Sequence, residues 1–132
     1  MEGTPLKPIV IDELRIEERD EMPGKVELYF CGRSNARQPI DLLGPFFGQW
    51  LDRAAQKSAR LVLRFEELEY MNSSTISAII HLIQGAKVRK LALELTYAPA
   101  KKWQKLSFDA LRVFQKQDDN LTLTPIVEGT PA

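Results

Sequence analysis

The sequence contains few of the residues that disulfides, metal sites and nucleic-acid surfaces require. Among its 132 residues there is one cysteine, Cys31, and one histidine, His81. A single cysteine forms no intramolecular disulfide. One cysteine and one histidine together provide too few ligands for a typical zinc site. The 18 basic and 18 acidic side chains cancel, so the broad positive field of a nucleic-acid-binding protein is absent. We expect no metal, no other cofactor and no nucleic-acid partner.

Sequence motifs of catalysis and of membrane insertion are missing as well. The chain has no glycine-rich loop that would cradle a phosphate and no nucleophile elbow. No apolar run approaches the length that crosses a membrane, and residues 1–5 lack the basic and apolar regions of a signal peptide. We expect a non-enzymatic cytoplasmic protein with no catalytic residue and no membrane partner, a location that also suits a lone cysteine.

The composition that is present fits one domain. A length of 132 residues with 44% apolar content is enough for a single hydrophobic core. We expect one domain over residues 1–132, with its core over about residues 9–123. The proline-containing arm up to Lys7 and the tail over residues 125–132 are expected to be flexible.

Alternating apolar residues predict five strands. They occur over residues 9–16, 26–30, 61–65, 91–97 and 121–123. The Pro23-Gly24 turn between the first two predicts an antiparallel hairpin, and the polar, aperiodic residues 32–38 predict a surface loop. The connector after residue 65 is acidic, and we interpret it as a solvated loop.

Apolar residues at three- and four-residue steps predict three helices. The first is expected to begin around Gly44-Pro45, because proline is tolerated in a first helical turn. The second begins at the hydroxyl cluster after Asn72, and the third follows the break at Pro99 and includes Trp103. The helices therefore alternate with the last three strands, which is typical of an α/β protein.

This order predicts a mixed β-sheet of about five strands with three helices mainly on one face. Strand–helix–strand units run parallel and right-handed, and the clean alternation in the strands indicates one covered and one polar face. Residues 32–41 and 66–73 both follow the carboxyl ends of strands. We expect them at the same edge of the sheet, where open α/β sheets usually place their sites.

Three consecutive hydroxyl side chains, Ser73, Ser74 and Thr75, open the second helix. Serine and threonine favour this position because their oxygens accept hydrogen bonds from N–H groups without an intrahelical partner. One interpretation is that Ser73 or Ser74 is only an N-cap, worth about 1 kcal/mol. Asn72 is expected to orient the turn by bonding to the backbone two residues on.

The element order, with a hydroxyl-rich turn opening the second helix, resembles the STAS domain of sulfate transporters and anti-sigma factor antagonists. In bacterial antagonists the turn typically reads Asp-Ser-Ser-Gly, and its first serine is phosphorylated. Residues 72–75 read Asn-Ser-Ser-Thr, so the acidic residue is replaced by an amide and the glycine by a threonine.

The chain is more similar still to the SiaC-like group of small regulatory phosphoproteins, over roughly residues 9–123. Their turn has the form Tyr-Leu-Asn-Thr-Ser-Ser-Ile, and residues 70–76 read Tyr-Met-Asn-Ser-Ser-Thr-Ile. The Gly44-Pro45 pair also looks like theirs. In that group the residue matching Ser73 is a reversibly phosphorylated threonine, and the unphosphorylated form binds and activates a diguanylate cyclase.

The resemblance implies a regulatory protein that acts by phosphorylation-controlled partner switching, with Ser73 as the phosphosite and Ser74 and Thr75 as alternatives. The implied partners are a serine/threonine kinase of the anti-sigma type, a phosphatase and a signalling enzyme such as a diguanylate cyclase. The alternative is a constitutive STAS-like interaction module whose turn is not phosphorylated.

The expected partner-binding surface surrounds the turn. Its residues are Tyr70, Met71, Asn72, Ser73, Ser74, Thr75 and Ser77, with Arg33 and Arg37 from the neighbouring loop. The two arginines are included because a guanidinium matches the oxygens of a phosphate bidentately.

Overall fold

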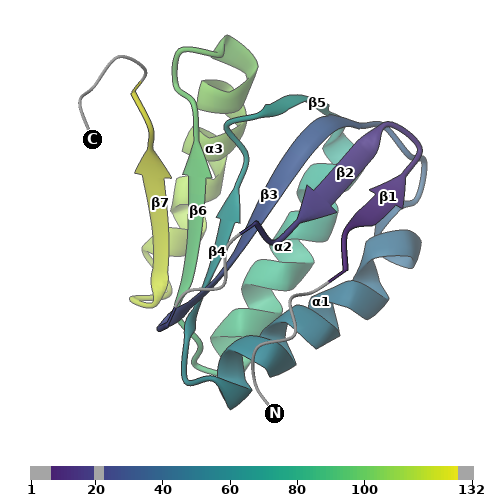
Figure 1. Ribbon diagram of the computed structural model, residues 1–132. Coiled ribbons are helices and arrows are strands. Elements are labelled where there is room, and N and C mark those ends of the chain that lie inside the picture. The colour runs from purple at the N-terminus through teal and green to yellow at the C-terminus, as the bar shows by residue number, and fades with distance from the viewer. Residues whose placement is uncertain (1–6, 20–22, 128–132) are drawn as a thin grey trace.

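The computed structural model of the chain describes residues 7–19 and 23–127, which fold around one mixed β-sheet (Figure 1). In chain order the described elements are β1 (Ile9–Ile11), β2 (Leu14–Glu17), β3 (Lys25–Ser34), α1 (Pro39–Gln56), β4 (Arg60–Arg64), β5 (Leu68–Met71), α2 (Ser73–Val88), β6 (Leu93–Tyr97), α3 (Lys102–Gln115) and β7 (Leu121–Pro125). The predicted α/β class and the three predicted helices are confirmed within these residues.

The strand order is β1-β2-β3-β4-β6-β7, and β5 pairs with β3 off this path. β1, β2 and β3 are antiparallel, which confirms the hairpin that the sequence predicts across Pro23-Gly24. β3, β4, β6 and β7 are parallel, because each is joined to the next by a helical crossover. Most of the arm predicted up to Lys7 and of the tail predicted from Pro125 lies outside the described residues, although β7 continues to Pro125.

The described sheet has seven strands, so the prediction of about five is wrong in two places. The segment over residues 9–16 is two strands, because Asp12 has a positive φ of 54° that turns β1 back on β2. The acidic connector contains β5, whose end residues Leu68 and Met71 are buried. This strand is not predicted because Glu67 and Glu69 flank Leu68, so the segment shows no clear apolar pattern.

α1 begins at Pro39, five residues before Gly44 and six before Pro45, so the predicted start is too late. Pro39 occupies the first helical position, where its missing N–H costs nothing, and Leu43 packs into the core. Pro45 is inside the helix and exposed. The sequence contains two prolines that could start this helix, and burial of residues between them selects the first.

One face of the sheet carries the hydrophobic core. The ring of Phe30 in β3 stacks on the ring of Phe65, the residue that follows β4, with 4.5 Å between their centroids. Phe30 also contacts Trp50 of α1, and Phe65 contacts Phe108 of α3. Since these two aromatic residues share a face, α1 and α3 cover the same side of the sheet, and α2 packs beside α1 (Figure 1).

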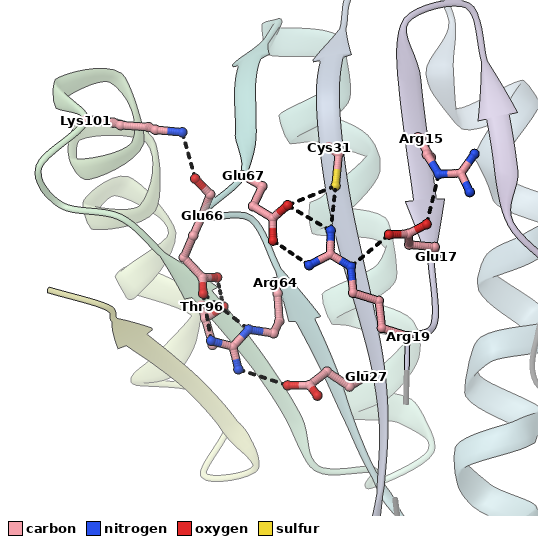
Figure 2. A network of polar contacts seen from close by, with 10 residues as sticks. All are labelled: Arg15, Glu17, Arg19, Glu27, Cys31, Arg64, Glu66, Glu67, Thr96 and Lys101. Carbon is pink, nitrogen blue, oxygen red and sulfur yellow. Dashed lines mark hydrogen bonds and ion pairs between the residues drawn. The ribbon is translucent and has the colours of Figure 1, made fainter. Parts of the chain in front are cut away.

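The opposite face carries a network of ion pairs (Figure 2). Arg19 bonds Glu67 at 2.6 and 2.8 Å, and Arg64 bonds Glu27 at 2.9 Å. Both guanidinium groups also lie near the ring of Tyr29, at 4.1 and 5.5 Å from its centroid. This face is polar as predicted, and its charges are matched with one another.

Candidate functional site

Residues 72–75 form the hydroxyl turn that opens α2, and Asn72 holds it in place. Asn72 is the N-cap of α2, and its Oδ1 accepts hydrogen bonds from the Thr75 backbone N–H at 2.9 Å and from the Thr75 hydroxyl at 2.7 Å. Its Nδ2 donates to the Ala36 carbonyl at 2.9 Å. The interpretation of Ser73 or Ser74 as the N-cap is therefore wrong, and the bond from Asn72 reaches three residues on rather than two.

A second bond joins the turn to the sheet. The hydroxyls of Ser34 and Thr75 lie 2.7 Å apart, and both side chains are buried, at 3% and 2% exposure. The Asn72 backbone N–H donates to the Ser34 carbonyl at 3.0 Å. These contacts confirm that residues 32–41 and 66–73 meet at one edge. They also show that Ser34 belongs to β3 and that Thr75 is an internal anchor of the turn.

α3 positions β5, and thereby the turn that follows it. Gln104 is fully buried, and its Nε2 donates to the carbonyls of Phe65 at 2.7 Å and Leu68 at 3.0 Å. Its Oε1 accepts from the Ala98 backbone N–H at 2.7 Å. Lys101 Nζ donates to the Glu66 carbonyl at 2.7 Å. Because the connector is bonded at both ends, the chain enters α2 from a fixed position.

The remaining hydroxyls of the cluster point outward. Ser73, Ser74 and Ser77 are exposed in the first turns of α2, and the Ser77 hydroxyl donates to the Ser73 carbonyl at 3.3 Å. The Ser73 and Ser74 hydroxyls have no hydrogen bond among the described residues. Ser73 and Ser74 are thus accessible to a modifying enzyme, whereas Thr75 presents no free hydroxyl.

Two arginines near the turn have no carboxylate partner. Every other described arginine forms an ion pair, at residues 15, 19, 53, 60, 64, 89 and 112. Arg33 and Arg37 form none among the described residues. Arg33 lies over the ring of Tyr70, 5.0 Å from its centroid, and is paired with it across β3 and β5. The free positive charge of the described arginines is therefore concentrated beside the turn.

The other predicted surface residues divide between groove and core. Arg37, Ser74, Ser77 and His81 line a groove of about 410 Å³ between the start of α1 and α2, which Asp41 also lines. Tyr70 is 39% exposed, whereas Met71 is 5% exposed and packs in the core. The structure thus brings Arg37, Ser74 and Ser77 together in this groove and Arg33 together with Tyr70, and it buries Met71 and Thr75.

Sequence reasoning missed Ser34 and Gln104, which hold the turn in place. Ser34 lies in a polar stretch that has no periodicity, and Gln104 is one of several polar residues in an amphipathic helix. Gln104 occupies a position on the apolar face of α3, where an apolar residue is usual. A polar residue at that position is the signal that could have identified Gln104 from the sequence. No local signal marks Ser34.

Several titratable groups on the polar sheet face have shifted pKa values. Hydrogen bonds from Arg19 lower the pKa of the Glu67 and Glu17 carboxyls. Burial, with a contribution from the Glu67 carboxylate, raises the pKa of the Cys31 thiol. A thiol with a raised pKa stays protonated and is a poor nucleophile at neutral pH. The polar face is therefore a matched charge network rather than an activated site.

No family model matches the chain, and a search of curated proteins finds no significant match. Among the residues that the structure describes, no three or more His, Cys, Asp or Glu side chains group so as to hold a metal ion. No helix in the described ranges is long and apolar enough to span a membrane.

Proposed function

We propose that the protein is a non-enzymatic cytoplasmic regulator that switches partners according to phosphorylation of Ser73. The observation that carries this is an exposed serine at a helix start held by Asn72, in a turn that neighbours two arginines without an ion pair among the described residues: Arg33 lies over Tyr70, and Arg37 lines a groove with Ser74. The resemblance to STAS domains and SiaC-like phosphoproteins supports the same assignment. The unphosphorylated form binds a signalling partner such as a diguanylate cyclase or an anti-sigma-type kinase, and a phosphatase resets it.

The helix start is suited to carry the phosphate without unfolding. A phosphate adds about −1.5 to −2 charges and three acceptor oxygens. At the first position of α2 it would meet free N–H groups and the positive end of the helix dipole. Asn72 and Thr75 hold the turn through bonds that do not involve Ser73, so the modification changes the charge of the surface and leaves the fold intact.

The switch then acts on the partner. On the surface of the unmodified protein the exposed serines near Arg33 and Arg37 are uncharged, and Asp41 offsets one of the two arginine charges. A phosphate on Ser73 reverses the sign of that surface and competes for the arginines. A partner that fits the first surface is repelled by the second.

The alternative is a constitutive interaction module, in which the same exposed surface docks permanently and Ser73 is never modified. Thr75 in place of glycine and Asn72 in place of aspartate keep this alternative open, because both depart from the antagonist turn. The two proposals differ in the mass of the native protein and in the effect of charge at Ser73.

The test combines mass spectrometry with partner capture. Intact-mass and peptide analysis of protein from its native cells should find one phosphate on Ser73 under some growth conditions. In pull-downs, Ser73→Ala should retain the partner that wild type captures and Ser73→Asp should lose it. Ser58→Asp is the matched control, since it adds the same charge at an exposed serine with a positive φ, at the far end of α1, and should retain the partner. No phosphate in any condition, with equal capture by all forms, would reject the switch and favour the constitutive module.

A further inference from the structure

β1 is a terminal strand of the sheet, and among residues 7–19 and 23–127 no strand pairs with its outer edge. Natural sheets usually block such edges with charged residues, proline or bulges, because unpaired N–H and C=O groups recruit other strands. β1 consists of Ile9, Val10 and Ile11, with no charged residue, proline or bulge within it, so its protection is limited to its short length and to Pro8 just before it. The opposite terminal strand, β7, ends in Pro125. The two edge strands therefore differ, since β7 contains a proline and β1 contains none.

An apolar groove runs along the free edge. It has a volume of about 510 Å³ between β1 and α1 and is lined by Leu42, Phe46 and Trp50 together with residues 7–11 and Gln49. Leu42 in this groove is 45% exposed, and Val10, whose side chain lies on the other face of β1, is 63% exposed. A strand added along β1 would cover this groove with every second side chain.

The register of β1 shows which side chains such a strand must carry. Ile9 and Ile11 pair with Ile16 and Leu14 of β2, whose side chains are buried on the helix-covered face. Val10 pairs with Arg15 and lies on the polar face. The incoming strand therefore needs apolar residues two apart on the groove side, which is the pattern that β1 itself has.

We propose that β1 pairs antiparallel with β1 of a second copy of this chain, about a two-fold axis at Val10. In such a self-complementary interface Val10 opposes Val10, and Ile9 opposes Ile11 of the second copy. The isoleucines of each copy then fill the groove of the other, against Leu42 and Phe46. The two sheets become one continuous sheet across the axis.

The charges at the two ends of β1 favour this antiparallel pairing. Lys7 precedes the strand, and the exposed turn Asp12-Glu13 follows it. These three side chains have no ion pair or hydrogen bond among the described residues. Antiparallel pairing brings Lys7 of each copy to the acidic turn of the other, so the attraction occurs twice. A parallel pairing would place like charges together.

The interface is small, because β1 has three residues. Stable dimers usually bury at least about 1,200 Å² in total, so this association is expected to be weak and dependent on concentration. In solution, this association should be observed as a reversible monomer–dimer equilibrium of the chain.

Sedimentation velocity at increasing protein concentration tests the proposal. Wild type should shift from monomer toward dimer, while Val10→Lys and Val10→Glu should each raise the dissociation constant at least about tenfold, because like charges would face each other on the axis. An equimolar mixture of the two variants should recover the dimer. Val88→Lys, at another exposed valine in α2, is the control and should behave as wild type.

Circular dichroism of each variant establishes that it is folded, which the exposure of Val10 leads us to expect. A wild type that remains monomeric at every concentration would overturn the proposal and leave this edge to a strand of a different protein. A dimer that persists in Val10→Lys, or a mixture that fails to recover it, would overturn the pairing about Val10.

Discussion

The hydroxyl oxygens of Ser34 and Thr75 lie 2.7 Å apart inside the protein and join β3 to the first turn of α2. Thr75 donates its single proton to Asn72 Oδ1, which can only accept. Ser34 therefore donates to Thr75. This chain of three side chains connects the sheet to the helix whose surface carries Ser73.

Removing the Thr75 hydroxyl should destabilise the fold. Thr75→Val keeps the shape of the side chain but leaves the buried Ser34 hydroxyl without its acceptor, and should lower the free energy of unfolding by about 1–3 kcal/mol. Urea denaturation followed by tryptophan fluorescence measures this. The double variant with Ser34→Ala should cost less than the sum of the two single variants. Strict additivity would show that the two hydroxyls do not interact.

The structure separates the N-cap from the proposed phosphosite. Asn72→Ala should lower the free energy of unfolding by about 1–2 kcal/mol, because the cap bond to Thr75 is lost. Ser73→Ala should change it by no more than about 0.5 kcal/mol, as for an ordinary surface position. Thermal unfolding of both variants provides the comparison. A large decrease in the free energy of unfolding of Ser73→Ala would instead indicate a structural role for Ser73.

Phosphorylation of Ser73 should raise the stability of the protein slightly. A phosphate at the start of α2 gains about 0.3–1 kcal/mol from the helix dipole, and Arg33 and Arg37 add charge-assisted bonds. Differential scanning calorimetry of the phosphorylated and unphosphorylated chains should show a higher Tm for the former. This gain in Tm should be smaller in the Arg33→Gln/Arg37→Gln double variant. Arg60 forms an ion pair with Glu94 elsewhere on the sheet, so Arg60→Gln is the control and should leave the gain unchanged.

Two glycines with positive φ should differ sharply in their tolerance of alanine. Gly24 has a φ of +82° and open space where a Cβ would lie, so Gly24→Ala should cost about 1 kcal/mol. Gly32 has a φ of +88°, and its added Cβ would lie 2.0 Å from the Glu13 carbonyl oxygen. Gly32→Ala should therefore cost at least about 2 kcal/mol more, or prevent folding. Equal unfolding midpoints for the two variants would contradict this geometry.

The polar sheet face should make stability fall in acid. Arg19 lowers the pKa of the Glu67 and Glu17 carboxyls in the folded protein, so both contribute stability above their unfolded pKa of about 4.3. That contribution is lost as the pH falls through the lower folded values. Unfolding midpoints measured below about pH 5 should therefore decline less steeply in Arg19→Gln than in wild type. Arg60→Gln removes an equal charge from a different ion pair and is the control.

Much of the architecture can be predicted because it depends on patterns within short segments. The alternation in Val26, Leu28 and Phe30 predicts a strand with one covered face, and the hydroxyls before the isoleucine-rich stretch predict the start of α2. Errors occur where local signals conflict. Pro39 and Pro45 are both suitable for a first helical turn, and the glutamates around Leu68 conceal β5.

The sequence by itself determines which residues can carry the chemistry: one cysteine, one histidine, balanced charges and a cluster of hydroxyls. The tertiary structure alone decides what each hydroxyl does. Ser73 and Thr75 are two residues apart at the start of one helix, yet one is exposed and the other is bonded to Ser34, 41 residues away along the chain. Burial and long-range hydrogen bonding depend on strands that meet only when the chain folds, so no local pattern can assign these roles.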